Sequence, residues 1–197
     1  MKLLLASSST YRRTLLSRIV SDFEFLAPEI DETRHASESP RTMVLRLARA
    51  KATVGLAQSE ADIVIASDQT AVIDGRCLGK PGSVEVAKAQ LAEASGRCVR
   101  FLTSVVVSAR NGYLAADVVA CDAWFRPLST AEISDYVAAE APLDCAGSFK
   151  CEGLGIVLLQ RLSTDDPTAL IGLPLIALSR MLNEAGYPLI RAWRGAG

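Results

Sequence analysis

Three acidic residues, Asp31, Glu32 and Asp68, are placed where they could act on a ligand. Asp68 directly follows the apolar run at 63–66, which is typical of a buried strand, and α/β proteins bind ligands in the crevice beyond such strand ends. An acid there can accept a proton or bind a metal ion, although structural caps also use aspartate. Asp31 and Glu32 lie in a predicted loop, where they are either ligands for a hard divalent cation or solvated charges.

Two arginines follow a serine-rich turn near the start of the chain. Residues 7–9 are all serine, beginning with Ser7, and Arg12 and Arg13 come soon after. The apolar run at 3–6 predicts a strand that ends here and turns into a helix, whose free backbone N–H groups and dipole favour an anion. The arginines would strengthen such a site; the alternative is a polar loop with a serine cap.

Lys51 and Lys80 are the lysines whose surroundings suggest contact with phosphate. Lys51 extends an apolar stripe at helical spacing from Val44 and Leu47, so it points toward the interior unless its stem only follows the apolar face to solvent. Lys80 lies in the sequence GKP at 79–81. This is not a Walker A motif, because the glycine spacing is one residue short and proline replaces the required Ser or Thr. Lys80 can still contact a phosphate group.

A segment dense in small residues occupies positions 145–155 and carries Lys150 and Glu152. Small residues allow a ligand to approach the backbone closely. The glycines of this segment do not complete a dinucleotide-binding fingerprint, so the sequence gives no indication of NAD.

Composition restricts the chemistry further. The chain of 197 residues has one histidine, His35, which excludes a site built from several imidazoles and leaves catalysis to carboxylates, lysines and arginines. With 21 basic and 22 acidic residues the formal net charge is −1, which argues against general nucleic-acid binding. Five cysteines without a C-x-x-C spacing indicate reduced thiols, not a disulfide framework or a zinc site.

Neither the N-terminus nor the longest uncharged stretch predicts export or membrane insertion. The apolar run at 3–6 ends at the serines, well short of the roughly 7 to 15 apolar residues of an export signal. Residues 167–179 carry no charge, but Gly172 and Pro174 interrupt them and they fall short of the roughly 18 residues of a membrane span. We therefore expect a cytoplasmic protein.

The elements that must position these residues alternate along the whole chain. Without a repeat or a linker, residues 1–197 are predicted to form one α/β unit, in one or two lobes, on a mixed twisted β-sheet flanked by helices. Asp-Gly at 74–75 and Asn-Gly at 111–112 predict β-hairpins. The predicted strands are at 2–6, 61–67, 70–73, 99–109, 113–125 and 156–162, and the predicted helices begin near Thr10, after Ser39, at Ser83, at Ser129 and at Leu175.

Taken in order, these motifs resemble the Maf family of nucleoside triphosphate pyrophosphatases, from Leu3 to about Gly186. The segments that carry the resemblance are 5–13 (LASSSTYRR), 31–32 (DE), 46–52 (RLARAKA), 67–69 (SDQ), 79–81 (GKP) and 95–96 (SG). Within the family, residues 144–155 and 172–175 resemble the branch that hydrolyses 7-methyl-GTP, whereas other branches act on dTTP and UTP. Thr10 and Ala66 stand where the family commonly has Pro and Gly.

The resemblance implies a fold like that of Maf proteins and inosine triphosphatase, with a deep central cleft, and cleavage of a nucleoside triphosphate to a monophosphate and pyrophosphate. It implies that Asp68 is the proton acceptor and that a divalent cation, Mg²⁺ or Mn²⁺, is bound by Glu32 and Asp68. The division of proton transfer and metal binding between these carboxylates stays open. The candidates for contact with the substrate are Ser7, Arg12, Arg13, Lys51, Lys80 and Lys150, and those for the choice of base are Tyr11, Gln69 and Glu152.

The predicted function is therefore hydrolysis of 7-methyl-GTP to 7-methyl-GMP and pyrophosphate, which removes a modified nucleotide from the pool. The alternatives are a pyrophosphatase for dTTP, UTP or another modified nucleotide, and a nucleotide-binding regulator of cell division. An acid at the site favours turnover, because a sensor needs no base. The expected partner is a nucleotide, without nucleic acid or membrane, and a homodimer is left open.

Overall fold

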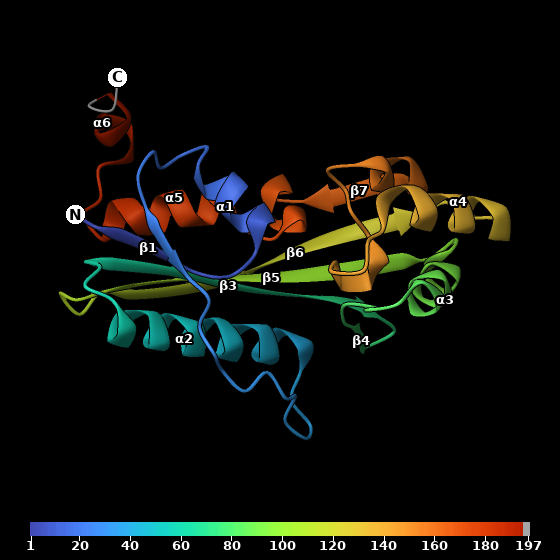
Figure 1. Ribbon diagram of the computed structural model, residues 1–197, viewed down its shortest axis with the longest axis horizontal. Coiled ribbons are helices and arrows are strands. Elements are labelled where there is room, and N and C mark those ends of the chain that lie inside the picture. The colour runs from blue at the N-terminus through green and yellow to red at the C-terminus, as the bar shows by residue number, and fades with distance from the viewer. Residues whose placement is uncertain (195–197) are drawn as a thin grey trace.

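One mixed β-sheet runs the length of the molecule in the computed structural model, which describes residues 1–194 and side chains as far as residue 191 (Figure 1). Its strands are β1 (Leu3–Ala6), β2 (Glu24–Leu26), β3 (Ile63–Ile73), β4 (Arg76–Leu78), β5 (Cys98–Ala109), β6 (Leu114–Phe125) and β7 (Leu159–Thr164). Their order is β2-β1-β3-β5-β6-β7, with β4 attached to β3. β1 is parallel to β2 and β3, whereas the other pairs are antiparallel, so the predicted mixed sheet is confirmed.

Helices cover both faces of this sheet (Figure 1). They are α1 (Thr10–Leu16), α2 (Pro40–Gln58), α3 (Val84–Ala94), α4 (Thr130–Glu140), α5 (Leu175–Glu184) and α6 (Leu189–Arg194), with 3-10 turns η1 (Ala146–Ser148), η2 (Leu154–Leu158) and η3 (Pro167–Ile171). The hydroxyls of Ser9, Ser39, Ser83 and Ser129 cap α1 to α4 by accepting a backbone N–H of the first turn, which explains why those helix starts are predictable. In the part of the chain that is described, every helix is too short or too polar to cross a membrane.

Alternating side chains of β1 and β3 assign one face of the sheet to each helical layer. Within 3–6 and 63–66, the odd-numbered residues pack with α1 and α5, and the even-numbered residues pack with α2. Continued along β3, the same alternation places Asp68 on the α2 face and directs Ser67 and Gln69 to the opposite face.

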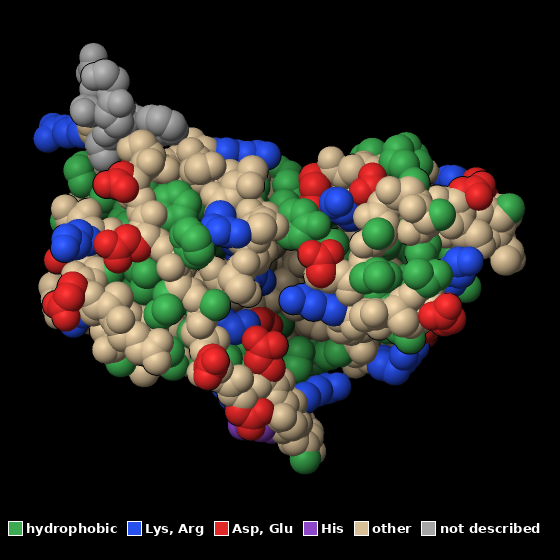
Figure 2. All heavy atoms as spheres, viewed as in Figure 1, with side chains coloured by type: hydrophobic (Ala, Val, Ile, Leu, Met, Phe, Trp, Pro, Cys, Tyr) green, Lys and Arg blue, Asp and Glu red, His purple; other side chains and the backbone are tan. Residues whose placement is uncertain are grey.

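A second hydrophobic cluster forms at the other end of the sheet. The ring centroid of Phe149 lies 5.7 Å from that of Phe101 and 5.3 Å from that of Phe125. Buried residues of α3 and α4, including Leu91 and Ile133, complete this cluster. Because β3 and β5 contribute to both clusters, the two lobes share one sheet, and a hollow lies between them (Figure 2).

One edge of β3 lacks a continuous neighbour. On this edge, β1 pairs with residues 63–65 and β4 pairs with residues 71–73. Among the described strands, the intervening residues 66–70 pair only with β5, on the other edge. Side chains from both faces of β3 can therefore reach the space beside this open stretch.

The structure corrects some predicted boundaries. β3 continues without interruption from Ile63 to Ile73, so Asp68 lies in mid-strand and not beyond a strand end. The polar residues there are compatible with a strand because β5 pairs with their backbone. Residues 154–158 form the turn η2, although the apolar pattern predicts a strand from residue 156. The short elements β2 and α6 have no counterpart among the predicted elements.

Gly55 on α2 provides a test of how closely this helix packs on the sheet. A Cβ added at Gly55 would lie 2.8 Å from Cγ1 of Val64 and 3.2 Å from Cβ of Ala6. Gly55→Ala should therefore lower the free energy of unfolding by about 1–3 kcal/mol through overpacking, despite the better helix propensity of alanine. Chemical denaturation followed by circular dichroism measures this change. Val64→Ala removes the methyl group that a Cβ at position 55 would meet. In the double variant, the decrease in the free energy of unfolding should therefore be smaller than the sum of the two single decreases. Additive losses would show that α2 has room to shift.

Candidate active site

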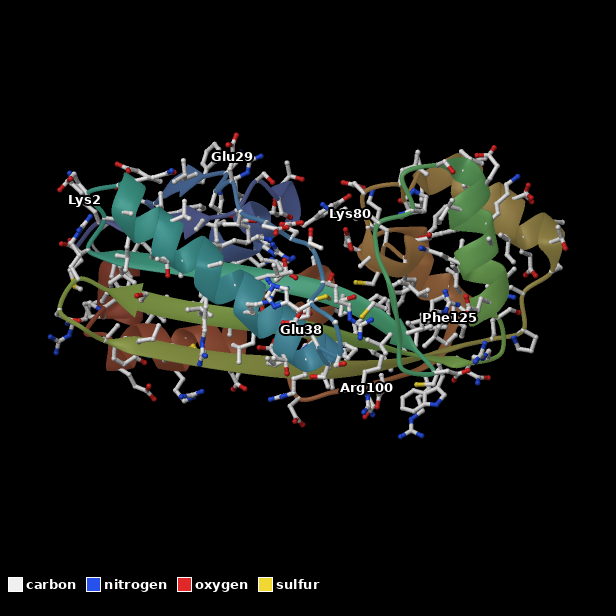
Figure 3. All side chains as sticks on the ribbon, turned by 90° about the horizontal axis from the view of Figure 1, so that it is seen from below. Lys2, Glu29, Glu38, Lys80, Arg100 and Phe125 are labelled. Atoms are coloured by element: carbon white, nitrogen blue, oxygen red, sulfur yellow. The ribbon has the colours of Figure 1, made fainter. Side chains whose placement is uncertain are left out.

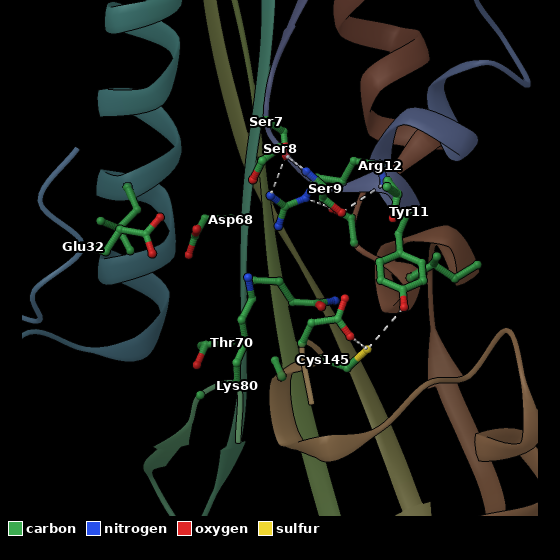
Figure 4. A pocket seen from close by; sticks show the side chains of 18 of the residues that line it. Ser7, Ser8, Ser9, Tyr11, Arg12, Glu32, Asp68, Thr70, Lys80 and Cys145 are labelled. Carbon is green, nitrogen blue, oxygen red and sulfur yellow. Dashed lines mark hydrogen bonds between the residues drawn. The ribbon is translucent and has the colours of Figure 1, made fainter. Parts of the chain in front are cut away.

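A cavity of about 680 Å³ opens beside the unpaired edge of β3, between the two lobes (Figures 2 and 4). This volume is typical of a site for a small molecule. Its walls come from the loop after β1, from α1, α2, β3 and η3, and from the segments after β4 and α4. The lining residues are Ser7, Ser8, Ser9, Thr10, Tyr11, Arg12, Pro28, Glu32, Met43, Leu47, Lys51, Asp68, Gln69, Thr70, Gly79, Lys80, Asp144, Cys145, Ala146, Phe149, Glu152, Leu170, Ile171 and Gly172.

Lys51 carries the positive charge that joins the two candidate metal ligands. Its Nζ donates to Oδ1 of Asp68 at 2.7 Å and lies 2.7 Å from Oε1 of Glu32. The side chains of Lys51 and Asp68 are 10% and 12% exposed, whereas that of Glu32 is 62% exposed. The hydrogen bond from Lys51 lowers the pKa of Glu32, so this carboxylate is ionised at neutral pH. The α2 face therefore contributes a nearly buried Lys51–Asp68 ion pair with one exposed acid beside it.

Arg12 contributes a second positive charge, and its orientation is fixed by the backbone. Its Nε donates to the carbonyl of Gly172 at 2.9 Å, and its Nη1 donates to Oγ of Ser7 at 3.3 Å. Oγ of Ser67 on β3 donates to the same Gly172 carbonyl at 2.8 Å. Burial lowers the pKa of Arg12, and nearby carboxylates oppose this effect. The guanidinium remains charged, because an arginine loses its proton only far above neutral pH.

Lys80 reaches the cavity from the other lobe. It follows β4 in a loop, and its exposed side chain lies at the gap between the two parts of the molecule (Figure 3). The charge of Lys80 adds to the effect of Lys51 in lowering the pKa of Glu32. Basic side chains from α1, α2 and the loop after β4 therefore converge on the cavity.

The part of the cavity near Tyr11 is acidic. Sγ of Cys145 donates to the hydroxyl of Tyr11 at 3.9 Å (Figure 4), and Asp144 and Glu152 lie in the same wall. Burial raises the pKa of Cys145 to about 12, and Asp144 adds to this rise. Burial also raises the pKa of Tyr11, with contributions from Cys145 and both acids. The thiol and the phenol stay neutral at physiological pH, so the charged groups of this part are the two carboxylates and the ammonium of Lys150, whose Nζ lies 6.0 Å from the centroid of the Tyr11 ring.

The side chain of Gln69 faces the turn η3. Its Nε2 lies 2.9 Å from Oγ1 of Thr103, 2.9 Å from the carbonyl oxygen of Ala169 and 3.0 Å from that of Leu170. A carbonyl oxygen can only accept a hydrogen bond, so the amide must present its nitrogen in this direction. Gln69 thus connects β3 to η3 while it also lines the cavity.

The structure brings most of the predicted site residues to this one cavity. Those that line it are Ser7, Tyr11, Arg12, Glu32, Lys51, Asp68, Gln69, Lys80 and Glu152. Arg13 is not among them, and its guanidinium lies 4.3 Å from the ring centroid of Phe25. Lys150 is also outside the lining, with Nζ 3.3 Å from Oε2 of Glu140. Nζ of Lys150 also lies 6.0 Å from the centroid of the Tyr11 ring, which does line the cavity. Substrate contact by Arg13 and by Lys150 stays a prediction.

Some lining residues are not among those predicted from the sequence. Asp144 and Cys145 line the cavity, as does Thr70. Asp144 precedes the small-residue segment directly, which is a signal that points to it. The carbonyl of Gly172 offers no such signal, because its role depends on backbone position and not on residue type.

The acids of the cavity suit a divalent cation that is bound together with phosphate. Among the described residues, no cluster of three or more His, Cys, Asp or Glu side chains has the geometry of a metal site. Mg²⁺ bound with a nucleotide commonly takes one or two carboxylates and completes its shell with phosphate oxygens and waters. Glu32 and Asp68 each place one oxygen 2.7 Å from Lys51 Nζ, so both carboxylates border the same point of the cavity.

Fold and cavity together define an α/β protein with a charged cleft between two lobes. A family profile described as "Maf-like protein" matches residues 2–185. The chain belongs to this family, and the resemblance carried by its motifs is confirmed.

Curated relatives match this chain over nearly their whole length. A "7-methyl-GTP pyrophosphatase" of Xanthomonas campestris pv. campestris is 49% identical over 188 residues, which are 95% of this chain and 98% of the relative. A protein of the same name from Alkalilimnicola ehrlichii is 53% identical over 189 residues, which are 95% of each chain. Among solved structures, the Ham1 protein of Staphylococcus aureus is 16% identical, with a TM-score of 0.47 over 64% of this chain and 72% of that one.

Lys51→Met should destabilise the protein, whereas Lys80→Met should leave the melting temperature unchanged. The first change leaves the nearly buried carboxylate of Asp68 without its partner, and breaking a buried pair in this way costs about 3 kcal/mol. The second removes an exposed charge. Thermal melts of both variants and the wild type measure the difference. Equal melting temperatures for the two variants would contradict this interpretation of the Lys51–Asp68 pair.

The loss caused by Lys51→Met should also depend on pH. Lys51 lowers the pKa of Glu32 in the folded protein, so this pair stabilises the fold above the ordinary glutamate pKa. That stabilisation is lost as the pH falls through the lowered pKa of the folded state. The difference in stability between wild type and Lys51→Met should therefore be largest at neutral pH and should shrink toward acid pH. A difference that is constant across the pH range would show that Glu32 does not contribute.

Proposed function

We propose that this chain hydrolyses 7-methyl-GTP to 7-methyl-GMP and pyrophosphate. The observation that carries the proposal is that Arg12, Lys51 and Lys80 line one cavity whose wall beside Tyr11 carries the carboxylates of Asp144 and Glu152. A triphosphate is polyanionic, and methylation at N7 makes guanine cationic, so the basic residues and this wall match the two ends of this nucleotide. Relatives about half identical to the chain carry the name of this activity.

Beside the basic residues, the proposed chemistry is attack of a water molecule on the α-phosphorus with departure of pyrophosphate. Asp68 accepts the proton of the attacking water. Arg12, Lys51 and Lys80 neutralise charge on the phosphate oxygens, which is the main requirement of phosphoryl chemistry and needs no histidine. Ser7 contributes by accepting a hydrogen bond from Arg12.

A divalent cation, Mg²⁺ or Mn²⁺, is part of the proposal. Glu32 and Asp68 would hold it, and when bound it would supply further positive charge at the phosphate oxygens. The ammonium of Lys51 keeps the two carboxylates together, because it lies 2.7 Å from an oxygen of each. Glu32 is the more exposed of the two, so it is the carboxylate that an arriving metal–nucleotide complex meets first.

In the acidic part, charge and ring geometry would select the base. A cationic 7-methylguanine gains about 0.5 to 2 kcal/mol over the face of an aromatic ring such as Tyr11. Glu152 can accept hydrogen bonds from the guanine N1–H and exocyclic amine while its charge complements the methylated ring. The acids that raise the pKa of Tyr11 act on the ligand in the same sense, since they favour positive charge nearby.

Asp68→Asn should abolish release of pyrophosphate and preserve nucleotide binding. The amide retains an oxygen that accepts from Lys51 but is too weak a base to take a proton from water. A screen of 7-methyl-GTP, GTP, dTTP and UTP with Mg²⁺ or Mn²⁺ measures turnover, and calorimetry measures binding. Asp135→Asn, at an exposed position on α4, serves as a control with wild-type activity. Full activity in Asp68→Asn would contradict the mechanism, and binding without turnover by the wild type would favour a regulator.

Glu152→Gln should reduce turnover of 7-methyl-GTP far more than any residual turnover of UTP. Tyr11→Leu should narrow the preference for 7-methyl-GTP over GTP, because the leucine side chain has no π face for a cation. Ratios of kcat/KM over the nucleotide panel measure both effects. If both variants hydrolyse the panel in wild-type proportions, this account of base selection is wrong, although the pyrophosphatase activity would stand.

A further inference from the structure

The loop between β2 and α2 carries Glu32 on an exposed stretch of chain. Residues 27–39 form neither helix nor strand, and all of residues 31–37 are exposed. An exposed segment gains little from the burial of apolar surface, so polar contacts must hold it in place. The position of Glu32 therefore depends on hydrogen bonds and ion pairs made by this loop.

Arg46 on α2 fastens this stretch on both sides of its tip. Its Nε donates to Oε1 of Glu38 at 2.7 Å, and its Nη2 donates to Oε2 at 2.9 Å, so the pair is bidentate. The same Nη2 donates to the carbonyl oxygen of Thr33 at 3.0 Å, directly after Glu32. Glu38 lies beside α2 (Figure 3), and its side chain is only 6% exposed, which distinguishes this pair from an ordinary surface ion pair.

Glu38 in turn folds the tip of the loop back on itself. Its Oε2 accepts from the backbone N–H of His35 at 3.2 Å, and its backbone carbonyl accepts from Nη2 of Arg34 at 2.7 Å. The hydrogen bond from Arg46 lowers the pKa of Glu38 to about 2, and the His35 N–H adds to this decrease. The carboxylate is therefore ionised at neutral pH, and one guanidinium organises the whole tip.

The helix α2 thus holds the loop at two points. Nζ of Lys51 lies 2.7 Å from Oε1 of Glu32, and Arg46 holds the backbone of Thr33. Because both basic residues belong to one helix, the distance between these two points of attachment is fixed. Lys51 also pairs with Asp68, so the attachment places Glu32 relative to the buried carboxylate of β3.

We propose that Arg46 is a positioning residue for Glu32. By holding the loop, it keeps the carboxylate of Glu32 beside Lys51 and Asp68, where the cation and the triphosphate would be bound. This inference rests on the proposed function, in which Glu32 holds a divalent cation. Arg46 is the first residue of the segment 46–52 and lies outside the cavity lining, so its effect on the site passes through the loop.

The consequence is a specific change in the requirement for metal. A released loop would place Glu32 correctly in only a fraction of the molecules, and the apparent affinity for a ligand falls by that fraction. If about one molecule in ten is competent, the metal concentration for half-maximal rate rises about tenfold. Saturating metal selects the competent molecules, so kcat should return to near its wild-type value.

The test measures pyrophosphate release from the best nucleotide of the panel at increasing Mn²⁺ concentration. Arg46→Met should raise the Mn²⁺ concentration for half-maximal rate about tenfold. Glu38→Gln should raise it by less, because Arg46 keeps its bond to Thr33. Arg100→Met is the matched control and should leave it unchanged, since Arg100 makes a bidentate pair with Asp122, at 2.6 and 2.7 Å, outside the cavity lining. Circular dichroism measures the folded fraction of each variant.

Limited proteolysis by trypsin, without metal or nucleotide, tests the fastening itself. Cleavage after the exposed Arg34, identified by mass spectrometry, should be several-fold faster in Arg46→Met than in the wild type or in Arg100→Met. An unchanged rate of this cleavage or an unchanged Mn²⁺ requirement would overturn the inference, as would a fall in kcat that saturating Mn²⁺ does not restore. Absence of pyrophosphate release by the wild type from every nucleotide would instead overturn the proposed function.

Discussion

The charge state of the cleft depends on one lysine ammonium placed between two carboxylates. Lys51 Nζ lies 2.7 Å from both Asp68 and Glu32, and the first of these acids is nearly buried. Like charges at such close range repel strongly, and burial adds to the cost of each charge. The ammonium of Lys51 offsets this repulsion, because it places a positive charge beside both carboxyl groups. The apolar stripe of α2 positions this ammonium, because Val44 and Leu47 are buried on the same face of the helix as Lys51.

The open stretch of β3 explains how a strand can carry a site at its middle. A residue in the interior of a sheet normally has neighbours on both edges and helices on both faces. Among the described strands, only β5 pairs with residues 66–70, so Asp68 from one face and Gln69 from the other both border the same cavity. Arg12 from α1 and Lys80 from the loop after β4 line the same opening.

Local sequence patterns predict much of this architecture and many of the residues that form the site, but they do not predict the direction of each side chain. Serine caps and the Asn-Gly turn act over a few residues, so the helix starts and the β5–β6 hairpin are predictable. Arg12 and Arg13 are adjacent in the sequence, yet neighbours on a helix point about 100° apart, and only Arg12 reaches the cavity. The partner of Gln69 at Ala169 is 100 residues away, and no local pattern can reveal such a contact.

The sharing of one sheet by both lobes determines how the cleft can respond to a ligand. β3 and β5 pair without a break from Ile63 and Ala109 to Val72 and Arg100, so a ladder of backbone hydrogen bonds passes beneath the cleft. Such a ladder resists bending far more than a flexible hinge does, because closure would have to distort many hydrogen bonds at once. The cleft is therefore preorganised, and its shape before binding determines which ligands fit. Ordering on binding then falls mainly on the rotatable bonds of the ligand.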